Sequence, residues 1–219
     1  MDYQRLYEYR FRDVDQGARD AVWKPIAAFL YGRLGRPERV LDPAAGRCEF
    51  LNAVPASERW GIDMAEYDER VADPGIKIIV ADALQADLPQ DYFDGIFVSN
   101  FLEHLPGQET VNAFLVTMLG CLRPGGRIAV IGPNYRHCAK QYWDFADHIV
   151  ALTHHAVEEH LYTAGFTPLE TAPQFLPYSF TGILPPSPLL TEMYLRLRPS
   201  WRLLGKQFLL VAERPCVGS

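Results

Sequence analysis

Short apolar runs alternate with helical stretches along this chain, and no other feature of the sequence limits its fold as strongly. Five runs are rich in apolar and β-branched residues: 39–41 (RVL), 60–62 (WGI), 76–80 (IKIIV), 93–98 (FDGIFV) and 127–131 (RIAVI). Such short runs are typical of strands buried on both faces. Strands that alternate with helices predict βαβ units, and therefore an α/β fold with a parallel, doubly wound sheet.

Helical periodicity fills the intervals and the flanks. We expect helices over 17–34, 108–122 and 153–164. Pro25 predicts a kink or a late start in the first helix. The segment 123–126 (RPGG) predicts a stop after the second, and Gly165 closes the third. Beyond it we expect a strand at 166–171, a short amphipathic stretch at 189–197 and a last strand at 206–213.

The charge distribution limits the kinds of partner. The 219 residues carry a formal net charge of −6, and residues 41–112 alone carry 4 basic and 14 acidic side chains. This acidic middle third is a poor binding surface for nucleic acid or an anionic membrane, but it suits a cation. A solvated acidic face would have the same composition. No apolar stretch is long enough for a membrane span, and the first residues lack a secretory signal.

Cysteine usage indicates the compartment. The four cysteines are scattered and form no CxxC pair: Cys48, Cys121, Cys138 and Cys216. Reduced thiols in a cytoplasm are the simplest interpretation. We therefore expect a cytoplasmic protein without a membrane anchor.

An acidic residue follows each of the first three predicted strands. Asp42, Asp63 and Asp82 occupy matching places, and Ser99-Asn100 follows the fourth strand. In an open α/β sheet, ligands bind beyond the carboxyl ends of the strands. An acid about 20 residues after the first turn is placed to accept both hydroxyls of a ribose. The pattern predicts a nucleoside-binding edge.

These residues also carry a family resemblance. The motifs are VLDPAAGRCEFL (40–51), WGIDMAEY (60–67), VADALQADLP (80–89), FDGIFVSNFLEHLP (93–106) and LRPGGRIAVIGP (122–133). In this order they resemble the class I S-adenosylmethionine (SAM)-dependent methyltransferases, and more narrowly the small bacterial enzymes that modify natural products and glycans. The resemblance implies a Rossmann-like, seven-stranded sheet with helices on both faces. The sheet would be mostly parallel, with an antiparallel last strand between the fifth and sixth.

The resemblance also implies roles for the residues after the first two strands. Asp42, Ala44 and Gly46 would form the loop that faces the methionine part of SAM. Asp63 would hold the ribose hydroxyls, and Met64 would lie against the adenine. The sulfonium and ammonium groups of SAM suit an acidic pocket.

Further roles fall after the third and fourth strands. Asp82 would accept from the exocyclic amine of adenine, and the backbone N–H of Ala83 would meet a ring nitrogen. Ser99 and Asn100 would lie under the sulfonium and amino groups.

The first loop departs from the family's acid-x-Gly-x-Gly-x-Gly pattern. Only Gly46 remains, and Ala44 and Cys48 replace the other glycines. The loss leaves open a non-catalytic cofactor-binding protein on the same fold. It also argues against a nicotinamide oxidoreductase, because Glu49 near the expected third glycine would meet a pyrophosphate.

Side chains beyond the fourth and fifth strands are candidates for metal binding and catalysis. Glu103 and His104 are a carboxylate and an imidazole, but Asn100 stands where a related branch has a third ligand. Two ligands are too few, so we expect no metal. His148 and His154 are candidate general bases, although positioning alone supports many methyl transfers and Thr153 could simply cap a helix at His154.

Aromatic side chains are the candidate acceptor contacts. They lie in the N-terminal segment, in 134–160 and beyond: Tyr9, Trp23, Tyr135, Tyr142, Trp143 and Tyr178. The N-terminal aromatics suit either a lid or a core-packing helix.

The sequence thus predicts one methyltransferase domain over 1–219. We expect an N-terminal helical lid or cap (1–38), a cofactor-binding core (39–133), and an acceptor-side segment with the last strands (134–219). The expected reaction is in-line displacement onto an oxygen or nitrogen of a small molecule, a natural-product intermediate, with a sugar hydroxyl as the alternative acceptor. We expect no nucleic-acid or membrane partner, and a monomer or homodimer.

Overall fold

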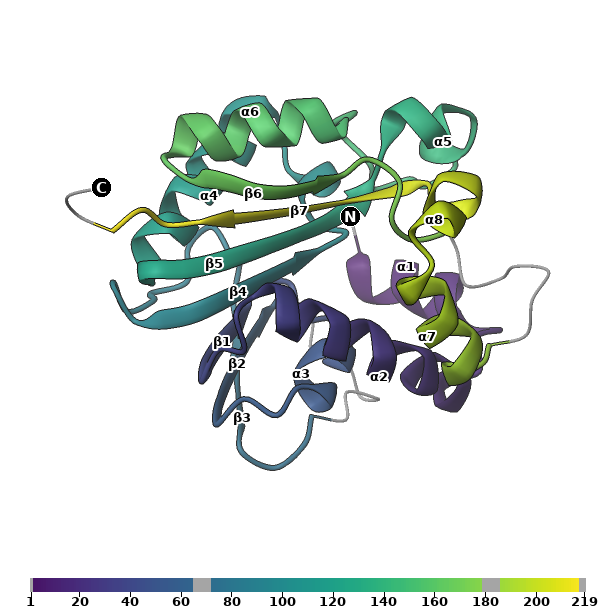
Figure 1. Ribbon diagram of the computed structural model, residues 1–219, viewed down its shortest axis with the longest axis horizontal. Coiled ribbons are helices and arrows are strands. Elements are labelled where there is room, and N and C mark those ends of the chain that lie inside the picture. The colour runs from purple at the N-terminus through teal and green to yellow at the C-terminus, as the bar shows by residue number, and fades with distance from the viewer. Residues whose placement is uncertain (1, 65–71, 179–185, 217–219) are drawn as a thin grey trace.

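Seven strands form one sheet in the order β3-β2-β1-β4-β5-β7-β6 (Figure 1). The computed structural model describes residues 2–64, 72–178 and 186–216. The first five strands pair in parallel, and β7 runs antiparallel between β5 and β6. The strands are β1 (Arg39–Asp42), β2 (Glu58–Asp63), β3 (Ile76–Val80), β4 (Phe93–Ser99), β5 (Leu122–Pro133), β6 (Thr167–Ala172) and β7 (Gln207–Glu213). This is the predicted fold class.

Helices cover both faces of the sheet (Figure 1). One face packs against α4 and α6, and the other packs against α2, α3, α7 and α8. Alternate residues of β5 point to the two cores, so Ile128 and Val130 face α4 while Ala129 and Ile131 face α2. The helices are α1 (Tyr3–Phe11), α2 (Gln16–Arg33), α3 (Glu49–Ala53), η1 (Leu102–His104), α4 (Gln108–Cys121), α5 (Tyr135–Tyr142), α6 (His154–Ala164), α7 (Pro188–Arg196) and α8 (Arg198–Leu204).

Local sequence explains where the long helices begin and end. The Asp15 carboxylate accepts from the N–H of Ala18 and caps α2, which continues through Pro25, so the late start was a wrong expectation. Ile26 and Leu30 of α2 are fully buried, and each such side chain stabilises the fold by about 1.5–3 kcal/mol. Thr153 caps α6 in the same way, and Gly165 ends it in the left-handed conformation, as predicted.

The expected turn at 123–126 lies inside β5. Gly125 has a φ of 76°, and the pairing of β4 with β5 shifts register between Phe93 and Gly95 before it resumes. Helix α1 lies within the helical cap expected over 1–38, whereas the short helices α3, α5 and α8 were not predicted. Among the described residues, no helix combines the length and the apolar character that a membrane span requires.

A close approach at Gly61 joins the sheet to the loop after β1. A Cβ at this position would lie 2.9 Å from the Cβ of Ala45 and 3.0 Å from Ile78 Cδ1 and Leu51 Cδ1. We therefore expect Gly61→Ala to destabilise the protein by about 1–3 kcal/mol, measured by urea unfolding. Gly32→Ala in α2 is the control, because no atom lies within 4 Å of its Cβ, and it should stabilise by roughly 0.5–1 kcal/mol. Equal stability of the two variants would contradict this packing.

Candidate functional site

The predicted cofactor residues meet at one edge of the sheet. Asp42 ends β1, Asp63 ends β2 and Ser99 ends β4, while Asp82 lies just beyond β3. These strands are parallel, so their carboxyl ends lie side by side. Asn100 continues the edge with a φ of 48°, and its Nδ2 donates to the Ser99 hydroxyl at 2.9 Å. Residues 65–67 of the WGIDMAEY motif lie outside the described residues.

The loop after β1 is held by hydrogen bonds to both acids. Asp42 Oδ1 accepts from the N–H of Ala44 at 3.1 Å, and Asp63 Oδ2 accepts from the N–H of Gly46 at 2.8 Å. Gly46 has a φ of 49°, which explains why a glycine remains there. Cys48, at the position of a missing glycine, keeps the left-handed backbone with a φ of 61°. The loop therefore keeps a glycine-like path without the glycine.

Asp42 is the most perturbed acid at this edge. Its side chain is buried, and burial raises the pKa of its carboxyl to about 8, which the N–H of Ala44 opposes. The other charges that act on it, Asp63 and Glu49, are both acidic and raise the pKa further. A buried carboxyl among acids is a favourable environment for a cation.

The loop after β3 forms a hydrogen-bonded turn. Asp82 Oδ1 accepts from the N–H of Leu84 at 2.9 Å, and the Asp82 carbonyl accepts from the N–H of Gln85. Ala83 is buried inside this turn, whereas Met64 across the edge is 55% exposed. An exposed thioether next to a polar turn offers an apolar surface to a flat ring.

Helix α1 lies against the same edge. Its Tyr7 has a raised pKa, mainly through burial and then through the charge of Asp147, with smaller contributions from Asp63 and Glu103. Arg10 makes two hydrogen bonds to the buried Asp147 carboxylate, at 2.5 and 3.0 Å. Burial alone would raise the pKa of Asp147, but these bonds and the neighbouring His104 lower it. This ion pair fastens α1 to the segment after α5.

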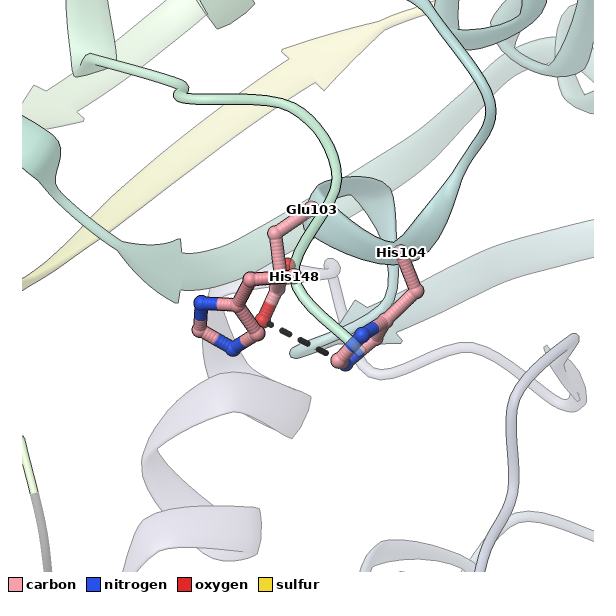
Figure 2. A group of neighbouring side chains, drawn as sticks. All are labelled: Glu103, His104 and His148. Carbon is pink, nitrogen blue, oxygen red and sulfur yellow. Dashed lines mark ion pairs between the residues drawn. The ribbon is translucent and has the colours of Figure 1, made fainter. Parts of the chain in front are cut away.

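A compact group of ionisable side chains lies beneath α1 (Figure 2). Glu103 and His104 come from η1, and His148 comes from the segment after α5. One potential ligand atom from each lies within 4.8 Å of the other two. Glu103 is 2% exposed, and burial raises its pKa. The sequence showed Glu103 and His104 as neighbours, but nothing in it linked His148 to them.

The two predicted catalytic histidines have different surroundings. Burial and the charge of His104 lower the pKa of His148 to about 4, and its ring stacks on Phe145 with 5.1 Å between centroids. His154 is 5% exposed, and its Nδ1 accepts from Asn134 Nδ2 at 2.9 Å. His154 therefore has a structural role in place of the predicted catalytic one.

Two of the aromatic candidates for acceptor binding are buried in the core. Trp23 is 6% exposed in the core, where it packs edge-on against Phe97, and Tyr142 is fully buried. Tyr142 also donates from its hydroxyl to the Val150 carbonyl. These two side chains stabilise the core, which corrects their predicted role as acceptor contacts.

The remaining aromatic candidates are exposed or half-buried. Tyr9 on α1 and Trp143 are exposed, and Tyr135 packs against Trp143 at 6.3 Å. Tyr178 packs edge-on against Phe145 at 5.6 Å and donates to the Gln141 carbonyl. Apart from Tyr9, these aromatics gather near His148 and can form a wall beside the edge.

Comparisons with known proteins agree with this geometry. Residues 41–130 match the family model of a methyltransferase domain. A SAM-dependent methyltransferase from Archaeoglobus fulgidus superimposes with a TM-score of 0.70 at 19% identity, covering 97% of this chain and 100% of that chain. A complex between the Haloferax volcanii Trm112 methyltransferase activator and the putative methyltransferase gives 0.67 at 16%, covering 99% of both chains.

A third structure contains ligands. It is the 1,6-didemethyltoxoflavin-N1-methyltransferase of Burkholderia thailandensis with bound 1,6-didemethyltoxoflavin and S-adenosylhomocysteine. Its TM-score is 0.62 at 19% identity, and the match covers 98% of this chain and 90% of that chain. The comparison with curated proteins finds no match.

The fold and the domain match both relate this chain to the methyltransferases. The sheet order, with its antiparallel strand, is that of the class I methyltransferases. Residues 41–130 form a methyltransferase domain, and the chain as a whole has the fold of the SAM-dependent methyltransferases on which it superimposes. The buried Asp42, whose charged neighbours are acidic, fits the positively charged end of SAM.

Proposed function

We propose that this chain is an enzyme that uses SAM to methylate an oxygen or nitrogen of a small molecule, a natural-product intermediate with a flat ring. The observation that carries the proposal is a group of aromatic side chains beyond the carboxyl end of β5, the strand beside β4: Trp143 is exposed, and Tyr135 and Tyr178 are half-buried. Flat rings of this kind bind flat ligands with little loss of side-chain entropy. The structural relative from Burkholderia thailandensis contains bound 1,6-didemethyltoxoflavin.

The cofactor supplies a methyl group on a positively charged sulfur. We assign Asp63 to the ribose hydroxyls, Asp82 to the adenine amine, and the N–H of Ala83 to a ring nitrogen. Met64 would cover the adenine. Support comes from the position of Asp63 and Asp82 at the ends of neighbouring parallel strands.

The methionine part of the cofactor would lie at the centre of the edge. We assign it to Asp42 and to the loop through Ala44 and Gly46, with Ser99 and Asn100 beneath the sulfonium and amino groups. The buried acid and the end of β4 support this placement.

Catalysis in this proposal rests on positioning. His148, with its pKa near 4, is too weak a base to take the proton of a hydroxyl efficiently. Holding the acceptor in line with the methyl group can supply most of the rate enhancement. Residues 1–38 would act as the lid, 39–133 as the cofactor core and 134–219 as the acceptor side, because α1 lies over the edge.

We further propose that the protein works in the cytoplasm, in biosynthesis, as a monomer or homodimer. Nucleic acid is a poor candidate partner because residues 41–112 are strongly acidic. A linear fall of log affinity for DNA or RNA with log salt concentration would contradict this view.

Two measurements test the proposed function. Calorimetric titration with S-adenosylhomocysteine should show micromolar binding, and NAD, the control, should show none. Methyl transfer from radiolabelled SAM is then measured on matched acceptor panels of phenols, heterocyclic amines and sugars. Transfer to a ring-bearing acceptor supports the proposal. Transfer to sugars alone would contradict the ring-bearing acceptor and favour a sugar hydroxyl as the acceptor.

A further inference from the structure

The group beneath α1 contains more potential ligands than the sequence indicated. The expectation of no metal counted only Glu103 and His104. The fold adds His148, 44 residues further along the chain, and one potential ligand atom from each residue lies within 4.8 Å of the others (Figure 2). A carboxylate and two imidazoles that converge in this way form a donor set common to divalent transition metals.

A hydrogen bond fixes the orientation of His104. Its Nδ1 lies 2.9 Å from the backbone carbonyl oxygen of Asp147. A carbonyl only accepts, so Nδ1 carries a proton, and in the neutral ring Nε2 presents a lone pair. That Nε2 lies 3.9 Å from Glu103 Oε1. Two acceptors that face each other are stabilised by a proton or a metal ion between them, and the bond to Asp147 is the second contact that metal-binding histidines usually make.

His148 completes the set. Its Nδ1 is buried and has no hydrogen-bond partner among the described residues. The ring is held by stacking on Phe145 and by an edge contact to Tyr142, with centroids 4.8 Å apart. Unsatisfied buried nitrogens are rare, so the polar surroundings of this ring are incomplete.

We propose that Glu103, His104 and His148 bind a divalent transition-metal ion through one carboxylate oxygen and two imidazole nitrogens. Two nitrogen ligands favour zinc, iron, cobalt or manganese over calcium, whose ligands are all oxygen. The Asp147 carbonyl orients His104, and Arg10 fixes the Asp147 side chain in turn. Asp147 is therefore a positioning residue.

The ion would also narrow the acceptor class, an inference that rests on the proposed function. Three protein ligands leave coordination positions open, and a hydroxyl oxygen of the acceptor fits one of them. Coordination lowers the pKa of that hydroxyl, which gives its proton to water. The oxygen lone pair then forms the bond to the methyl carbon, and the electron pair of the breaking C–S bond stays on sulfur. The substrate class becomes hydroxyl-bearing small molecules.

Cobalt binding tests the site without any turnover. The full chain, stripped with EDTA, is titrated with Co²⁺ in the absence of SAM and acceptor, and the visible d–d absorption is recorded. We expect bands that saturate at one ion per chain and that Zn²⁺ removes by competition. Absence of these bands in the folded wild-type protein overturns the metal site.

Variants show which side chains bind the ion. His148→Phe keeps an aromatic ring in the stack and should weaken Co²⁺ binding by at least about 10- to 100-fold. Glu103→Gln keeps the shape of the side chain and should do the same. His160→Gln, outside the group, is the matched control and should leave the affinity unchanged. Wild-type affinity in both His148→Phe and Glu103→Gln would overturn the assignment.

Titration with S-adenosylhomocysteine in parallel separates the two proposals. If the wild-type protein binds Co²⁺ but does not bind S-adenosylhomocysteine, the result counts against the proposed function alone. Intact cofactor binding without Co²⁺ bands would count against the metal site alone.

Discussion

Replacing Asp63 by Asn should reduce the affinity for S-adenosylhomocysteine by about 10- to 100-fold and leave the fold intact. The amide oxygen of the new side chain can still accept from the N–H of Gly46, which Asp63 binds at 2.8 Å. The variant loses the charged acceptor proposed for the ribose hydroxyls, and a hydrogen bond to a charged group contributes about 1.5–3 kcal/mol. Each 1.4 kcal/mol corresponds to a factor of about ten in affinity. Calorimetric titration measures the change.

The matched control lies at the opposite edge of the sheet. Asp91 precedes β4, pairs with Arg214 at 2.6 Å, and has a φ of 54° that Asn tolerates well. Asp91→Asn should bind S-adenosylhomocysteine like the wild-type protein. Undiminished affinity in Asp63→Asn would remove the central acid from the proposed cofactor site.

The second large effect is expected from Arg10→Met, which removes both charged hydrogen bonds of the buried Asp147 carboxylate and leaves His104, whose Nδ1 lies 3.5 Å from Asp147 Oδ2, as its neighbouring cation. The Asp147 side chain has no exposed surface, and Arg10 supplies both of its charged hydrogen bonds. Breaking a buried ion pair by removing one partner typically costs about 3–5 kcal/mol. We expect the loss to release α1 from the edge before the sheet unfolds. Hydrogen exchange of the α1 amides should accelerate, and cofactor affinity should fall.

Arg12→Met is the control for this variant. Arg12 directly follows α1, and its ion pair with Asp13 is exposed, with side-chain exposures of 55% and 88%. Exposed pairs contribute little to stability, so hydrogen exchange of α1 should stay at the wild-type rate. If the α1 amides exchange at the same rate in Arg10→Met and Arg12→Met, the aromatic side chains of α1 hold the helix in place without the ion pair.

The cofactor edge could be predicted from sequence because each determinant is local. Asp42, Asp63 and Asp82 each follow a short apolar run, and parallel strands bring the ends of such runs together. The place of the antiparallel β7 between β5 and β6 could not be predicted from the residues themselves. The family resemblance implied this strand order, and the strand pairing confirms it.

The features beneath α1 could not be predicted because they join distant segments. Arg10 and Asp147 are 137 residues apart, and no periodicity marks either as a partner. Neighbouring aromatic side chains also differ in solvent exposure: Tyr142 is fully buried, whereas Trp143 is 52% exposed. Composition shows that aromatic rings are present, but only tertiary packing decides which of them faces solvent.

The place of β7 has a consequence for how the protein is made. This strand is synthesised after all the others, yet it lies between β5 and β6 and pairs with both. While the chain emerges from the ribosome, β5 presents an unpaired edge until residues 207–213 are available. The cofactor half, β1 to β4, can assemble on the nascent chain, because its strands pair with earlier neighbours. The acceptor half must wait, and during that interval its exposed edge is a surface that chaperones can protect from aggregation.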